Sequence, residues 1–341
     1  MNQQVNAPPP NPRIVKNTTC EVKRVAVPAV SFSRNLRLCR LLFRQYAESK
    51  LNAEGVPYHQ TEERTIEFLR GYDAAIVAFE SINDQVLSAL PELKVVSKLG
   101  VGLDRIDPHA MKKHGVRLGW TAGVNKLPVA ELTLCLVLAA LRHVVPSNAS
   151  MRRGRRAVAT MGRQLNGRVV GIHGCGEIGK EFIRLLQPFG CTILTNDIRP
   201  DKPFCERFNV QPVSMDELLE RSEILSIHLS GTPKTRGLYD ARTLGRLRSD
   251  CVLINTARGS IVDEKALKEF LTANRFAAAA SDVFAVEPPT DMELLDLPNF
   301  IATPHIGAQT EEAIWRMGET AIEGLTKNFL PEPGVFPFDQ S

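Results

Sequence analysis

The chain has 341 residues, of which 43% are hydrophobic and 23% charged, and its formal net charge is +4. The length suits two folded domains, and the charge is too small to indicate a nucleic-acid partner. The seven cysteines are odd in number and none forms a Cys-x-x-Cys pair, which favours reduced thiols in a cytoplasmic protein over a disulfide framework.

Two stretches have unusual composition. Residues 1–20 are polar and proline-rich and contain no apolar segment typical of a secretory signal, so we expect a disordered tail. The most apolar stretch, 127–145, contains Glu131, Arg142 and His143, which favours a buried helix over a membrane span. We therefore expect no membrane partner.

Strand-like and helix-like segments alternate through the first part of the chain. Strands are predicted at 22–27, 74–79, 93–98 and 115–118, and helices at 35–53, 84–90 and 108–114. A domain boundary is expected near 120–125. The helix predicted next, at about 128–145, is apolar on nearly all faces, which leaves core packing and a subunit interface both open.

The alternation continues after that helix. Strands are predicted at 167–173, 191–196, 224–228, 251–255, 277–282 and 300–302, and helices at 177–189, 214–221, 240–247, 263–273 and 310–325. Such βα units predict an α/β fold with parallel sheets. The last helix could return to cap the first domain.

A glycine pattern follows the strand predicted at 167–173. Gly174 permits a tight turn, Gly176 lets the backbone approach a pyrophosphate, and Gly179 allows close packing of helix on sheet. The N–H groups of Glu177 and Ile178 and the helix dipole would face that anion. The segment predicts a dinucleotide site.

An acidic residue, Asp197, ends the next predicted strand. A carboxylate there can bind both ribose hydroxyls and would repel a 2′-phosphate, which favours NAD over NADP. Arg199 lies two residues later and weakens this inference, because a nearby arginine can accommodate the 2′-phosphate.

Three later segments carry a candidate catalytic set. Arg258, Glu287 and His305 each follow a predicted strand, and the carboxyl ends of parallel strands share one rim where ligands bind. The Arg258 guanidinium can hold a planar carboxylate and polarise a keto oxygen. The His305 imidazole can take and return a hydroxyl proton, and Glu287 would fix its tautomer and stabilise its charged form. No metal is expected.

These segments resemble the D-isomer-specific 2-hydroxyacid dehydrogenase family, especially its phosphoglycerate dehydrogenase-like members. The matching stretches lie at 98–107, 123–125, 129–132, 174–179 and 228–235 and in the three catalytic segments. The chain departs from the family pattern at Arg105, at Arg155 after Gly154, and at Ser230.

The resemblance implies a Rossmann-type nucleotide domain inserted into a flavodoxin-like substrate domain. The implied bounds are 21–122 for the first part of the substrate domain, 123–304 for the NAD-binding domain and 305–341 for the return. It also implies a homodimer that uses the helix after Asn125. No serine-binding regulatory domain is expected.

The resemblance also implies roles for further residues. Backbone amides at Val101 and Gly102 would help hold the substrate carboxylate, and Asp282 would meet the nicotinamide carboxamide. The turn containing Thr256 and Ala257 and the loop from His228 to Thr232 would line the cofactor. Apart from the resemblance, placement in the chain makes four basic residues candidates to contact a second anionic group: Lys98, Arg105, Lys126 and Arg34.

The leading hypothesis is an NAD-dependent oxidoreductase that transfers hydride between the C2 of a D-2-hydroxy acid and nicotinamide, with 3-phosphoglycerate as one candidate. The enzyme alternatives are a glyoxylate or hydroxypyruvate reductase and a phosphite-type dehydrogenase. A formate dehydrogenase is disfavoured, because that branch carries an amide where this chain has Glu287. An alternative of another class is an NAD-sensing transcriptional co-regulator.

Overall fold

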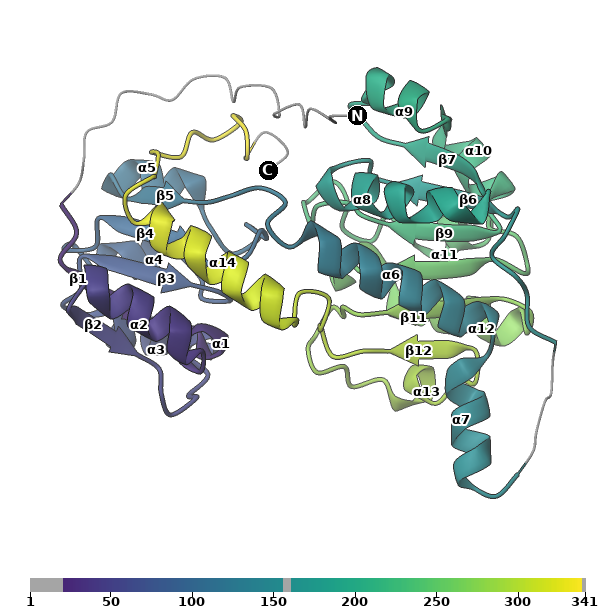
Figure 1. Ribbon diagram of the computed structural model, residues 1–341, viewed down its shortest axis with the longest axis horizontal. Coiled ribbons are helices and arrows are strands. Elements are labelled where there is room, and N and C mark those ends of the chain that lie inside the picture. Colours follow the sequence, from purple (N-terminus) through teal and green to yellow (C-terminus); the bar gives the residue numbers. More distant parts are fainter. Residues whose placement is uncertain (1–20, 156–160, 339–341) are drawn as a thin grey trace, which may run out of the picture. The chain divides into compact units, whose positions relative to one another are not determined.

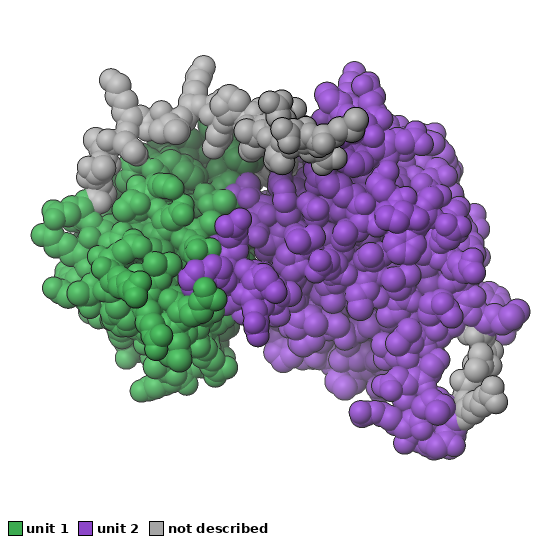
Figure 2. All heavy atoms as spheres, in the orientation of Figure 1, with its two compact units in different colours: residues 1–121, 317–340 green, residues 122–316, 341 purple. Residues whose placement is uncertain are grey.

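The computed structural model describes residues 21–155 and 161–338. The tail predicted at 1–20 therefore lies outside the described residues. The chain forms two compact units, residues 1–121 with 317–340 and residues 122–316 with 341 (Figure 2). The sequence predicted that the chain returns to the first domain at residue 305, and this domain boundary stays a prediction. In the structure the chain rejoins the first compact unit at Met317.

The first unit contains a parallel sheet of five strands in the order β2-β1-β3-β4-β5, which is the flavodoxin-like order (Figure 1). The strands are β1 (Arg24–Val27), β2 (Glu48–Leu51), β3 (Ala74–Val77), β4 (Val95–Lys98) and β5 (Arg117–Gly119). Strands β3 and β4 are buried along their whole length, as expected for a parallel sheet covered on both faces.

Helices cover both faces of this sheet. They are α1 (Val30–Ser33), α2 (Leu36–Gln45), α3 (Glu62–Leu69), α4 (Asp84–Ser88), α5 (Pro108–His114) and the later part of α14 (Glu311–Gly324). Side chains of α3, α4 and α5 form one core cluster with the sheet. On the other face α14 packs against α2, because Gly318 leaves room for the Leu38 side chain (Figure 1). The Ser97 hydroxyl donates to the Ala321 carbonyl and ties α14 to β4.

The second unit contains a parallel sheet of seven strands in the order β12-β11-β10-β9-β6-β7-β8. Counted from β6, its first six strands follow the doubly wound order of nucleotide-binding folds. The strands are β6 (Val169–His173), β7 (Thr192–Asn196), β8 (Val210–Pro212), β9 (Ile224–Ile227), β10 (Val252–Asn255), β11 (Ala278–Ser281) and β12 (Phe300–Ala302). The predicted α/β class with two parallel sheets is confirmed.

Helices also cover both faces of the second sheet. They are α6 (Lys126–Leu141), α8 (Glu177–Leu186), α9 (Lys202–Arg207), α10 (Met215–Arg221), α11 (Ala241–Leu244), α12 (Glu264–Ala273) and α13 (Met292–Leu295). Helix α7 (Val144–Arg152) follows α6 and has no buried residue. Helices α6, α8 and α9 contribute to one core cluster, and α10 to α13 contribute to the other. Among the described helices none alone is long and apolar enough to cross a membrane; α6 and α7 together pass that test but are bent by 64° at their break.

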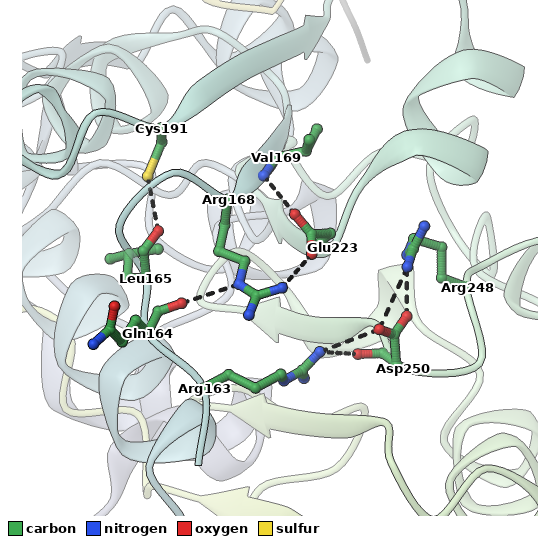
Figure 3. Close-up of polar contacts among 9 residues, drawn as sticks. All are labelled: Arg163, Gln164, Leu165, Arg168, Val169, Cys191, Glu223, Arg248 and Asp250. Carbon is green, nitrogen blue, oxygen red and sulfur yellow. Dashed lines mark hydrogen bonds and ion pairs between the residues drawn. The ribbon is translucent and has the colours of Figure 1, made fainter. Parts of the chain in front are cut away.

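Polar side chains tie together the amino ends of β6, β9 and β10 (Figure 3). Arg168 pairs with Glu223 at 2.5 Å, and Glu223 also accepts the Val169 N–H at 2.9 Å. Asp250 receives hydrogen bonds from both Arg163 and Arg248. This network lies at the amino ends of the strands. The carboxyl ends, where ligands bind in parallel sheets, carry other residues.

Two predicted helices were wrong in extent. The helix predicted at 35–53 ends at Gln45, and 48–51 form the edge strand β2, whose polar sequence Glu-Ser-Lys-Leu carries no strand periodicity. The helix predicted at 128–145 ends at Leu141, because His143 adopts a left-handed backbone with φ of 52° and a second helix, α7, begins there. The short elements α1, α3, α9, β8 and α13 were not predicted.

Candidate active site and nucleotide-binding loop

The glycine loop joins β6 to α8 in the second unit. Gly174 has φ of 97°, a conformation that favours glycine, and a Cβ there would meet the His228 carbonyl oxygen at 2.8 Å. A Cβ on Gly179 would overlap the Gly174 carbonyl oxygen. A Cβ on Gly176, by contrast, would have no heavy atom within 4 Å. The fold thus needs glycine at 174 and 179, whereas the space beside Gly176 is open.

Gly176→Ala is therefore expected to fold normally and to weaken NADH binding by at least about tenfold, because the added methyl occupies the space a diphosphate needs. Thermal unfolding and a fluorescence titration with NADH measure the two effects. Gly179→Ala is the comparison, and its overlap with the Gly174 carbonyl should lower the melting temperature. Unchanged NADH affinity in Gly176→Ala would place the diphosphate elsewhere.

Asp197 lies just beyond β7 and faces the glycine loop. One carboxylate oxygen accepts the Cys175 N–H at 2.6 Å, and the other accepts the Arg199 N–H at 2.7 Å. The carboxylate is thereby fixed at the carboxyl end of the sheet, beside the loop. The Cys175 thiol is buried, and burial raises its pKa to about 11, so it stays protonated near neutral pH.

Two histidines lie near the glycine loop: His173 is buried, and His228 is partly exposed although its Nδ1 atom is buried. His173 shares a 2.7 Å hydrogen bond between Nδ1 and the Tyr239 hydroxyl, and burial lowers its pKa to about 4 although the charge of Asp197 opposes this. His228 shares a 2.9 Å hydrogen bond between Nε2 and the Ser226 hydroxyl, and burial lowers its pKa to about 3. Both imidazoles are neutral at physiological pH, so neither suits acid–base catalysis there.

The Arg258 turn follows β10. The Asn255 side chain fixes it by donating to the Arg258 carbonyl at 3.0 Å and accepting the Ala257 N–H at 3.1 Å. The Thr256 hydroxyl shares a 2.9 Å hydrogen bond with Thr133 of α6. The next residue, Gly259, lies directly on the Phe284 backbone, where a Cβ would overlap the Phe284 carbonyl. This close approach brings the Arg258 turn to the segment that carries Glu287.

Glu287 and His305 form a hydrogen-bonded pair. The distance from Glu287 Oε2 to His305 Nδ1 is 2.9 Å, and Glu287 Oε1 accepts the Phe284 N–H at 3.0 Å. Burial raises the pKa of the Glu287 carboxyl, but the hydrogen bonds from His305 and Phe284 and the charges of His305 and Arg258 outweigh burial and hold that pKa below its ordinary value. The carboxylate is therefore charged near neutral pH and holds His305 through Nδ1.

Asp282 holds the turn that carries His305. Its Oδ1 accepts the Thr303 hydroxyl at 2.6 Å and the Ile306 N–H at 2.8 Å, and its Oδ2 accepts the Gly307 N–H at 2.8 Å. The His305 N–H donates to the Asp282 carbonyl at 2.8 Å. His305 has φ of 54°, which is strained for a residue with a side chain, and this set of bonds maintains it.

Asp282→Asn is expected to lower kcat about tenfold, because an amide offers one acceptor oxygen where three donors converge, and its NH2 group opposes an N–H. NADH affinity should stay near wild type, since the change acts on the His305 turn. Steady-state kinetics and an NADH titration separate the two effects. Asp250→Asn, at the opposite edge of the sheet, is the matched control. A variant that loses NADH affinity and keeps kcat would instead favour the nicotinamide contact.

The remaining predicted cofactor residues lie on turns of the same unit. The Thr232 N–H donates to the Thr235 hydroxyl at 2.9 Å and closes the loop after β9. Glu177 and Ile178 form the first turn of α8. Ala257 is buried. The side chains not predicted from the sequence are Thr133, Tyr239 and Thr303, which are joined to site residues by contacts between distant segments.

The predicted substrate residues Lys98, Val101 and Gly102 belong to the first unit. Lys98 ends β4, is almost fully buried and donates to the Ala78 carbonyl. The Trp120 indole donates to the Val101 carbonyl at 3.0 Å. Gly100, with φ of 108°, turns the chain between them. These contacts order the loop within its own unit. Across residues 21–155 and 161–338, no three His, Cys, Asp or Glu side chains are grouped to hold a metal.

The second unit thus places a glycine loop, an acidic strand end and the residues Arg258, Glu287 and His305 at the carboxyl ends of its parallel strands. This arrangement defines a dinucleotide-binding oxidoreductase of the α/β class. The sequence model of the D-isomer specific 2-hydroxyacid dehydrogenase NAD binding domain matches residues 134–307. The chain belongs to this family, and the cofactor that the matched domain names is NAD.

Individual relatives agree with the family. The chain is 33% identical over 288 residues to a hydroxypyruvate reductase of Thermotoga maritima, covering 83% of this chain and 93% of the relative. It is 35% identical over 270 residues to a D-3-phosphoglycerate dehydrogenase of Methanocaldococcus jannaschii, covering 78% of this chain and 52% of the relative. It therefore spans about half the length of that dehydrogenase. A solved glyoxylate reductase from Paecilomyes thermophila is similar with a TM-score of 0.78 and 25% identity, covering 89% of this chain and 94% of that one.

Proposed function

We propose that the protein is an NAD-dependent dehydrogenase that transfers hydride between the C2 of a D-2-hydroxy acid and nicotinamide. The observation that carries the proposal is the hydrogen-bonded pair of Glu287 and His305 beside Arg258, in the same unit as the glycine loop. The pair is partly exposed, so a substrate can reach it. Family membership supports the same reaction class.

Each residue has a role in the proposed reaction. Arg258 binds the substrate carboxylate with paired hydrogen bonds and polarises the C2 oxygen. His305 Nε2 accepts the hydroxyl proton during oxidation and donates it during reduction. Glu287, bonded to Nδ1, fixes the tautomer and stabilises the protonated ring. NAD, when bound, supplies the hydride acceptor.

The proposed cofactor site runs along the rim of the second sheet. The open space at Gly176 and the first turn of α8 would hold the diphosphate. Asp197 would bind the ribose hydroxyls, and its fixed carboxylate supports NAD over NADP. The turn with Thr256 and Ala257 and the loop from His228 to Thr232 would line the cofactor.

The substrate is proposed as a small D-2-hydroxy or 2-keto acid. Two candidates stand: 3-phosphoglycerate, and glyoxylate or hydroxypyruvate. The hydroxypyruvate reductase of Thermotoga maritima, of which this chain covers 93%, favours the second. Lys98, proposed to contact a phosphate, donates within its own unit to Ala78, which lends the first candidate little support.

The test is NADH oxidation against phosphohydroxypyruvate, hydroxypyruvate and glyoxylate, repeated with NADPH. Preference for the phosphorylated acid would assign a phosphoglycerate dehydrogenase, and turnover of the smaller acids alone would assign a general keto-acid reductase. NADH binding without turnover of any acid would contradict the proposed enzyme and move the assignment to the NAD-sensing co-regulator.

A homodimer is proposed through α6 and α7. The exposed apolar side chains there are Leu127, Val144, Val145 and Met151, each between 46% and 65% exposed. A second copy would cover them, and the molar mass in solution tests this directly. The described cysteines are all free thiols, which supports the proposed cytoplasmic location.

A further inference from the structure

The first turn of α8 carries a charge that opposes the ligand proposed for it. Glu177 is the first residue of this ten-residue helix, and its side chain is 51% exposed. A carboxylate at a helix amino terminus is stabilised by the helix dipole. A cofactor diphosphate bound at the same terminus would be repelled by it.

A lysine from another helix compensates this charge. Lys126 begins α6, and its Nζ lies 2.9 Å from Glu177 Oε2. The contact is held in place by packing: Gly123, with φ of 63°, lies against the Glu177 side chain, and a Cβ there would meet Glu177 Cγ at 2.8 Å. The turn before α6 therefore orients the carboxylate toward the lysine.

We propose that Lys126 is a positioning residue for the cofactor diphosphate, because it neutralises Glu177 and draws its carboxylate toward α6. This inference rests on the proposed function, since it concerns the same NAD site. An ordinary exposed ion pair contributes little to stability. The role of this pair is instead to set the charge next to the glycine loop, where each like charge within a few ångströms weakens anion binding.

A double-mutant cycle tests the proposal on the full-length protein. Lys126→Met should weaken NADH binding about tenfold at low salt, since it leaves Glu177 uncompensated, and should raise the KM for NADH while kcat stays near wild type. The loss should shrink at high salt. Lys126→Arg should retain wild-type affinity, because it keeps the charge.

The Glu177→Gln variant tests whether Lys126 acts through Glu177. Alone it should bind NADH about threefold more tightly, and combined with Lys126→Met it should return affinity to within about twofold of wild type. Lys268→Met, which breaks another lysine ion pair of the same unit, is the matched control and should leave NADH affinity unchanged.

Two results would overturn the inference. One is unchanged NADH affinity in Lys126→Met. The other is an equal loss in the Glu177→Gln background, which would mean that Lys126 acts independently of Glu177. Failure of the proposed function is distinct, because it would appear in the wild-type protein itself, either as no NADH binding or as NADH binding without turnover of any keto acid.

Discussion

His305→Ala is expected to lower kcat by about 10²–10⁴-fold while NADH affinity stays near wild type. The imidazole is the proton carrier of the proposed reaction, and it is fixed by a hydrogen bond to Glu287 and by the turn that Asp282 holds. The imidazoles of His173 and His228 cannot replace it, because desolvation lowers their pKa values to about 4 and about 3.

The measurement is single-turnover and steady-state reduction of the best keto acid, with NADH binding followed by fluorescence. His109→Ala, which removes an exposed histidine of the first unit, is the control and should keep full turnover. Added imidazole should restore part of the lost rate in His305→Ala, as it supplies the missing proton donor. Near-normal turnover of His305→Ala without added imidazole would show that His305 is not the acid–base residue.

Much of the second unit could be predicted from local sequence. β-branched strands followed by helices repeat through it, and each strand is buried enough to appear as a short apolar run. The glycine loop could be predicted because its spacing reflects backbone geometry within one turn. The candidate residues Arg258, Glu287 and His305 could be predicted to lie at the same edge of the sheet, because each follows a strand of a parallel sheet.

Other features depend on contacts that local sequence does not encode. Strand β2 was missed because an edge strand with polar residues has no periodic signal. The contact of Asp282 with the turn at Thr303 to Gly307 requires the register of β11 with β12. The ion pair of Lys126 and Glu177 joins two helices far apart in the chain. Such side-chain contacts are fixed by tertiary packing. A sequence pattern can therefore indicate that a residue is functional, but it does not indicate which distant residue it contacts.

Arg258→Ala is expected to lower kcat/KM by roughly 10²–10³-fold, with a raised KM for the keto acid, because the substrate carboxylate loses a charged, two-point partner. The effect on stability should be small. The Arg258 guanidinium donates to the Ala257 carbonyl at 2.7 Å, but the turn is also held by Asn255 and by the close packing of Gly259 on Phe284, which both remain in the variant.

Arg258→Lys separates charge from geometry. A lysine keeps the positive charge but loses the planar fork, so it should recover part of the KM effect and little of the kcat effect, if Arg258 also polarises the C2 oxygen. Arg242→Ala, on the exposed surface of the same unit, is the control. NADH affinity should be unaffected in all three variants. Loss of NADH affinity in Arg258→Ala, with an unchanged KM for the acid, would assign the guanidinium to the cofactor and not to the substrate carboxylate.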